Sequence, residues 1–135
     1  MGDEQLHNAL LSTLRLSGSG QLQEALQIMD ELIAEAISGG DGSTALVLIG
    51  HAALLNDNGR DRSLVKLYYD RFLTQNPENA RVLYESADEA MEDGQIELAK
   101  LYAKRCHNAL LKSDDAKLRK DLFDLVLERW PEVAG

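Results

Sequence analysis

Three stretches of the chain begin in the same way: GQLQEA at 20–25, GRDRSL at 59–64 and GQIELA at 94–99. Their first residues, Gly20, Gly59 and Gly94, are 39 and 35 residues apart. Self-similarity with a period of about 20 to 50 residues is typical of repeat proteins, in which each unit buries its apolar face against its neighbours. The sequence therefore predicts a solenoid of stacked supersecondary units.

The positions of glycine and proline along the chain predict that these units are helical. Glycines and the two prolines, Pro77 and Pro131, separate segments of helical length. No segment alternates apolar and polar residues as a half-buried strand does. We expect an all-α fold of about seven helices, over residues 3–17, 21–38, 43–57, 61–75, 78–92, 95–112 and 115–130.

Local residue choices mark three of the expected helix starts. The tripeptide at 41–43, Asp-Gly-Ser, offers an N-cap, and 76–78, Asn-Pro-Glu, places proline at a first helical position. Ser113 and Asp114 can cap the last helix. The segment from Ala45 to Leu55 is apolar nearly all round, so we expect a helix that is covered on several sides.

Composition limits the range of partners. The chain has 135 residues, which suits one domain, and a net charge of −9 with a pI near 4.7. Binding to nucleic acid or to an anionic membrane requires clustered Lys and Arg, so we expect neither. A basic or neutral protein partner fits better. The acidic start of the chain lacks the pattern of a signal peptide, which favours the cytoplasm.

The residue types that carry chemistry do not form a recognisable constellation. His7, His51 and His107 fall on different expected helices, and Cys106 has no second cysteine with which to pair. We expect His51 to be a neutral, hydrogen-bonded core residue and Cys106 a buried thiol. Residues 57–61 resemble a calcium loop only in passing. The sequence predicts no enzyme, no metal and no cofactor.

Small or aliphatic residues follow each of the three glycines, at positions where two helices would meet closely. They are Ala25, Met29 and Leu32, then Val65, Tyr69 and Phe72, then Ala99, Ala103 and Cys106. This pattern resembles the tetratricopeptide repeat, a helix-turn-helix unit of about 34 residues with an alanine early in its second helix. Pro77, at the end of the second unit, also matches the family pattern.

The resemblance implies one domain over residues 1–135, folded as a right-handed α-solenoid. Its repeats would span about 3–39, 43–77 and 78–112, with a capping helix at about 115–130. The third repeat is the cleanest copy. In the first repeat, one register leaves Leu10, Leu11 and Leu14 on the face opposite to the helix contact, and a shift by one residue would bury Leu10 and Leu14 instead.

A tetratricopeptide stack turns its first helices toward a concave groove, where we expect a partner to bind. The groove positions that the resemblance assigns are Ile49, Ala53, Asn56, Arg81, Tyr84, Glu85, Asp88, Met91 and Glu92. They grade from apolar to acidic, which favours a peptide or helix with apolar anchors and basic flanks. Some family members hold a C-terminal carboxylate with basic groove residues, but here only Arg81 corresponds.

The leucines of the first repeat offer an alternative function. If Leu10, Leu11 and Leu14 are exposed, they form an apolar patch that would bury against a second copy or against another domain. The chain would then be a structural or self-assembly module, a homodimer or part of a larger assembly.

Overall fold

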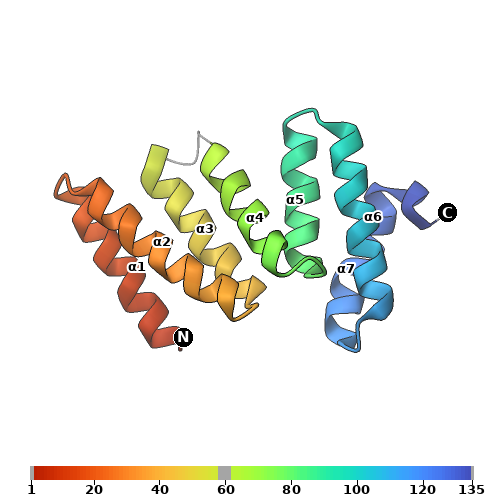
Figure 1. Cartoon of the computed structure of the whole chain (residues 1–135), viewed down its shortest axis with the longest axis horizontal. Helices are drawn as coiled ribbons and strands as arrows, with labels where there is room; N and C mark the ends of the chain where they lie inside the picture. Colours follow the sequence, from red (N-terminus) through yellow and green to blue (C-terminus); the bar gives the residue numbers. More distant parts are fainter. Residues whose placement is uncertain (1, 58–61, 135) are drawn as a thin grey trace. The chain divides into compact units, whose positions relative to one another are not determined.

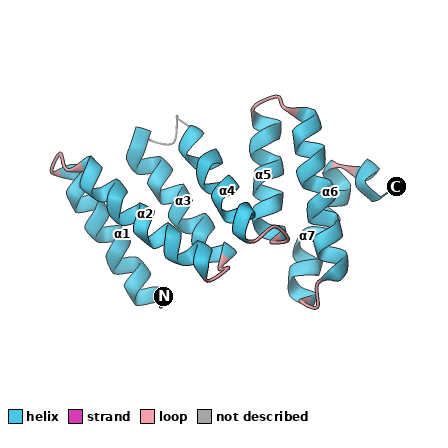
Figure 2. Cartoon of the chain, viewed as in Figure 1, coloured by secondary structure: helices cyan, strands magenta, loops and turns pink. Residues whose placement is uncertain are grey.

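The computed structural model describes residues 2–57 and 62–134, and over these ranges its regular secondary structure is entirely helical (Figures 1 and 2). This confirms the all-α prediction. The described helices are α1 (Asp3–Gly18), α2 (Leu22–Ser38), α3 (Gly42–Asp57), α4 (Ser63–Gln75), α5 (Ala80–Glu92), α6 (Ile96–Lys112), α7 (Ala116–Arg129) and a short 3-10 helix, η1 (Pro131–Ala134). The bounds of the seven α-helices differ from prediction by two residues at most, and η1 was not predicted.

Three helix ends share one backbone motif, which explains the recurring glycines. Gly20, Gly40 and Gly94 have φ angles of 79°, 66° and 75°. After α1, the N–H of Gln21 donates to the carbonyl of Leu16 at 2.8 Å, and the same bond recurs after α2 and α5 at 3.0 and 2.8 Å. This is the Schellman motif, whose left-handed position is usually glycine. Gly59 lies outside the described residues.

Side-chain caps fix three helix starts, one of them as predicted. Asp41 accepts from the backbone N–H of Thr44 at 3.1 Å and from its hydroxyl at 2.7 Å. These two bonds lower the pKa of Asp41. The other two predicted starts need correction, because the caps are Asn79, which accepts from the N–H of Val82, and Asp115. Residues 77–78 form a turn before α5 instead of its first turn.

The chain divides into two compact units, residues 1–68 and 69–135, with α4 spanning the division. In the first unit, α2 packs against both α1 and α3. Its buried side chains are Ala25, Met29, Ile33, Ala36 and Ile37. This inward face has the spacing of one helical stripe. The contact residue predicted as Leu32 is only half-buried.

Helix α3 packs against α2 and α1, as a helix predicted to be covered on several sides should, but one flank is exposed although its sequence is apolar nearly all round. It buries Ala45, Leu48, Ile49, Ala52 and Ala53. The opposite flank, which carries Val47, Gly50 and Leu54, is exposed. A uniformly apolar sequence does not distinguish the two flanks, because helical periodicity is visible only where polar residues alternate with apolar ones.

The second unit is built on the antiparallel pair α5 and α6, which lie side by side (Figure 1). Ala99, Ala103 and Cys106 are fully buried on α6. The Cys106 thiol lies 3.3 Å from the carbonyl oxygen of Ala80, and burial raises its pKa to about 12. The prediction of a buried thiol is thus confirmed. Such a high pKa leaves the thiol protonated and inert.

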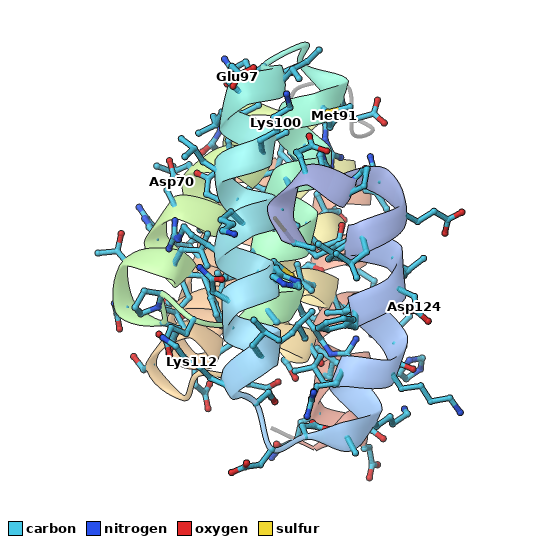
Figure 3. All side chains as sticks on the ribbon, turned by 90° about the vertical axis from the view of Figure 1, so that its right-hand side faces the viewer. Asp70, Met91, Glu97, Lys100, Lys112 and Asp124 are labelled. Atoms are coloured by element: carbon cyan, nitrogen blue, oxygen red, sulfur yellow. The ribbon has the colours of Figure 1, made fainter. Side chains whose placement is uncertain are left out.

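Helix α7 and η1 complete the second unit. Both pack against α6, and they bury Leu122, Val126, Trp130 and Val133. Lys104 holds η1 in place, since its Nζ donates to the carbonyl of Val133 at 2.6 Å. The outer surface carries charged side chains together with exposed apolar ones such as Leu101 and Leu111. Figure 3 shows Glu97 and Lys100 near one end of α6, Lys112 near the other, and Asp124 on the side of α7 turned away from α6.

The two kinds of glycine respond oppositely to alanine. We expect Gly94→Ala to lower the free energy of unfolding by about 1 kcal/mol, because an L-residue resists positive φ although nothing lies within 4 Å of the added Cβ. Gly50 lies inside a helix, and nothing lies within 4 Å of a Cβ added there. Gly50→Ala is therefore expected to raise the free energy of unfolding by about 0.5 to 1 kcal/mol. Urea unfolding measures both. Equal effects at the two sites would contradict the motif assignment.

Candidate functional site

The nine predicted partner-binding residues divide between the two units and differ in accessibility. Ile49 and Ala53 are each 1% exposed, so they belong to the core and their assignment to a binding surface is corrected. Asn56 is half-buried. The residues of α3 that are exposed instead are Val47 and Leu54. The exposed flank is thus shifted by about one residue along the helix from the predicted one. Sequence reasoning missed these two residues.

An apolar surface lies on the exposed flanks of α1 and α3. We call it the α1–α3 stripe and define it by Leu11, Leu14, Val47 and Leu54, which are 38%, 51%, 50% and 61% exposed. Leu10 is half-buried. The first helix therefore follows neither predicted register completely, since Thr13 is its one fully buried side chain among the described residues. Large apolar side chains gathered on neighbouring helices are typical of an interaction surface.

A hydrogen bond fixes the relative placement of the two helices. Thr13 Oγ1 lies 2.9 Å from Nε2 of His51 and 2.8 Å from the carbonyl oxygen of Leu10. The hydroxyl proton goes to the carbonyl, so His51 Nε2–H donates to Thr13. His51 is thus hydrogen-bonded as predicted, and burial lowers its pKa, which favours the neutral imidazole. Val47 and Leu54 lie one helical turn before and after His51, on the same flank.

The stripe is free of formal charge. Residues 5–14 and 42–56 contain no Asp, Glu, Lys or Arg. Acidic residues lie before both segments, at Asp3, Glu4 and Asp41. Arg15 follows Leu14 directly, so the uncharged apolar centre is bordered by charges of both signs, with acidic residues in the majority.

In the second unit, α7 covers part of the predicted binding face of α5. Arg81 pairs with Asp121 at 3.7 Å. The rings of Tyr84 and Trp130 meet edge to face, with centroids 6.1 Å apart. Of the predicted positions on α5, Met91 and Glu92 remain exposed, whereas the other four are half-buried.

Arg129, near the end of α7, makes the densest set of polar contacts on this face. Its Nη1 donates to Asp88 Oδ1 at 2.8 Å and to the hydroxyl of Tyr84 at 3.3 Å. Its Cζ lies 4.5 Å from the ring centroid of Trp130 and 5.8 Å from that of Tyr84. The hydrogen bonds to Tyr84 and then to Asp88 raise the pKa of Arg129. We call Tyr84, Asp88 and Trp130 the arginine corner.

Glu85 is held in an unfavourable environment beside this corner. Its pKa is raised by burial, then by the negative charges of Asp88 and Glu89, and Arg129 opposes the shift without cancelling it. Glu89 is itself 9% exposed. Three carboxylates therefore lie within one and a half turns of α5, and one of them, Asp88, contacts Arg129 of α7.

The remaining features give no further candidate. Over residues 2–57 and 62–134, no group of three or more His, Cys, Asp and Glu is placed to hold a metal ion. The calcium-like loop at 57–61 lies almost wholly outside the described residues. Open depressions of 320 to 370 Å³ lie among the described residues of the second unit around residues 76–79, on the outer side of α7, and between α6 and η1. No described helix is long and apolar enough to cross a bilayer.

Comparison of the chain with protein-family models, with curated proteins and with solved structures returned no match. Two surfaces of the protein itself indicate binding, the α1–α3 stripe and the face of α5.

The raised pKa of Glu85 has a measurable consequence for stability. The folded protein binds the proton of the Glu85 carboxyl group more tightly than the unfolded chain does. The free energy of unfolding therefore falls as pH rises from the unfolded pKa of Glu85, near 4.5, to its higher folded pKa. We expect Glu85→Gln to be more stable than wild type at pH 7, and this advantage to vanish below about pH 4. Thermal unfolding across that range measures it.

Glu92→Gln is the matched control, since Glu92 is exposed on the same helix and surface changes usually stay within about 0.5 kcal/mol. If Glu85→Gln were less stable than wild type at pH 7, the account of Glu85 would be wrong.

Proposed function

We propose that this chain is a protein-binding module that receives an amphipathic helix or peptide on the α1–α3 stripe, through apolar anchors with basic flanks. We propose further that its helices form a right-handed α-solenoid of tetratricopeptide-like repeats. Two features support the repeat assignment: the same glycine-closed turn ends α1, α2 and α5, and alanines occupy the buried side of the helices that follow two of these turns, at Ala25 and Ala99.

One observation carries the binding proposal, namely the exposure of large apolar side chains on α1 and α3. Leu54 is 61% exposed and Leu14 is 51% exposed. Covering the remaining exposed surface of each such side chain would contribute roughly 1 kcal/mol. A helix that presents apolar residues at positions i, i+3 or i+4, and i+7 matches a stripe of this kind.

Charge indicates what should flank those anchors. Residues 1–68 contain nine Asp and Glu against four Lys and Arg. The stripe itself contributes none of these charges, and the acidic residues that precede its two segments are Asp3, Glu4 and Asp41. A basic flank would then be steered toward the stripe and held at its edge without having to lose its hydration in the apolar centre.

Self-association is the second candidate, because Leu11 and Leu14 are exposed as that hypothesis requires. A second copy would cover the same stripe with Leu10, Leu11 and Leu14. However, each copy carries a net charge of −9, and bringing two such chains together is opposed by repulsion. The two candidates therefore respond oppositely to salt, which weakens attraction to a basic peptide and relieves repulsion between copies.

A labelled synthetic helix with leucines at i, i+3 and i+7 and lysines at both ends tests the proposal by fluorescence anisotropy. We expect wild type to bind with a dissociation constant in the micromolar range, about −8 kcal/mol. Val47→Asp should weaken binding at least about tenfold, since a charge would be buried without a partner. Raising the salt concentration should also weaken binding.

Leu101→Asp is the matched control, because Leu101 is 64% exposed on α6 and lies outside the stripe. Indistinguishable binding by wild type and Val47→Asp would refute the stripe as the binding surface. A dimer in sedimentation equilibrium that tightens with salt and is abolished by Leu14→Asp would favour the second candidate.

A further inference from the structure

We propose that the arginine corner of the second unit is a recognition site for an arginine side chain of a partner protein, and that the chain's own Arg129 fills this site when no partner is bound. The inference goes beyond the proposed function, because it assigns a second binding surface, the face of α5, and names arginine as the residue that this face selects. It concerns the second unit alone and does not depend on the α1–α3 stripe.

The first support is the way the corner surrounds a guanidinium group on several sides. Asp88 supplies a charge-assisted hydrogen bond of 2.8 Å and the Tyr84 hydroxyl a longer one of 3.3 Å. Trp130 supplies an aromatic face at 4.5 Å. A carboxylate and an aromatic face, arranged around one planar cation, are the groups that recognise arginine.

The second support is that the walls of the corner are fixed while its occupant is accessible. Trp130 is 2% exposed and packs edge to face on Tyr84, so the ring has contacts with the unit besides the one with Arg129. The Arg129 side chain is 34% exposed, and that of Asp88 is 38% exposed. The guanidinium can therefore leave to solvent, and another can enter by the same route, without unfolding of α7.

The third support is the charge around the corner. Glu85 and Glu89 lie near Asp88 on α5, and the pKa of Glu85 is raised first by burial and then by the charges of Asp88 and Glu89, despite Arg129. This negative charge attracts any cation and does not by itself distinguish arginine from lysine. Selectivity comes from the planar shape of guanidinium, which stacks on an indole and donates several hydrogen bonds at fixed angles, whereas ammonium is a compact and strongly hydrated point charge.

The chain's own arginine acts as an internal competitor. Because Arg129 is tethered beside the site, its effective concentration is high, on the order of millimolar or above. A partner's arginine must therefore be presented by additional contacts to replace it. Removing Arg129 should make the site available to a free arginine derivative, which gives a direct test.

The test uses Arg129→Ala in the full chain, with the fluorescence of Trp130 as the signal, since this is the single tryptophan of the sequence. N-acetyl-arginine amide and N-acetyl-lysine amide are titrated separately at constant ionic strength. We expect Arg129→Ala to bind the arginine amide about two- to fivefold more tightly than the lysine amide, the range of a cation–π preference. Wild type should bind the arginine amide at least about tenfold more weakly than Arg129→Ala does, because Arg129 competes for the site.

A second variant keeps the result interpretable. Asp88→Asn combined with Arg129→Ala removes the anion while keeping the shape of the corner, and should lose the arginine response. Circular dichroism checks that both variants are folded. Equal binding of the two amides by Arg129→Ala, no binding of either, or binding that survives Asp88→Asn would each overturn the proposal. None of these outcomes bears on the Val47→Asp result, so the two proposals fail separately.

Discussion

The close packing of α5 against α6 is the constraint on which the second unit depends. Ala99 and Ala103 are fully buried on α6, and Ala87 and Ala90 are buried on α5. Small side chains let two helix backbones approach closely, and this approach has to be matched by a turn short enough to reverse the chain. Gly94 supplies that turn through its positive φ. Helix α7 and η1 can then pack against the resulting surface of α6, and they bring Arg129 and Trp130 to the face of α5.

The two units differ in how their helix surfaces are covered. In the second unit, α7 covers α5 through an ion pair, an aromatic contact and the hydrogen bonds of Arg129. In the first unit, α1 contacts α3 through the hydrogen bond between Thr13 and His51, and the flank beside that bond stays apolar and exposed. One unit therefore offers uncharged apolar area, whereas the other offers a polar corner for a single cation. A protein ligand would bind the first surface through apolar contacts and the second through contacts with a single cation.

Much of the fold was accessible from the sequence because glycine, proline and capping residues mark helix ends by local chemistry. Asp41 and the glycines at 20 and 94 act as predicted. The exposed flank of α3 was not accessible, since leucine, valine and alanine occupy both of its sides and periodicity then gives no direction. The start of α5 was misplaced for a related reason: proline favours both a turn and a first helical turn, and the side chain of Asn79 decided between them.

The candidate site was predictable only in part, because it depends on contacts between helices that are distant in sequence. Tyr84 and Asp88 were singled out as surface residues of α5, but nothing in their local sequence indicates that Arg129, 41 residues beyond Asp88, covers them. Trp130 follows α7 directly, and its edge-to-face contact with Tyr84 accompanies the packing of α7 against α5. Tertiary contacts of this kind decide which charged residues of an acidic segment remain accessible.

The most direct measurement is the stability of Ala99→Phe, compared with Leu101→Phe on the exposed side of the same helix. If α5 and α6 meet at Ala99, the larger ring overpacks their interface, and urea unfolding should show a loss of about 1 to 3 kcal/mol or more. Leu101→Phe should stay within about 0.5 kcal/mol of wild type. Unchanged unfolding of Ala99→Phe would contradict the close approach of the two helices and, with it, the arrangement that positions the arginine corner.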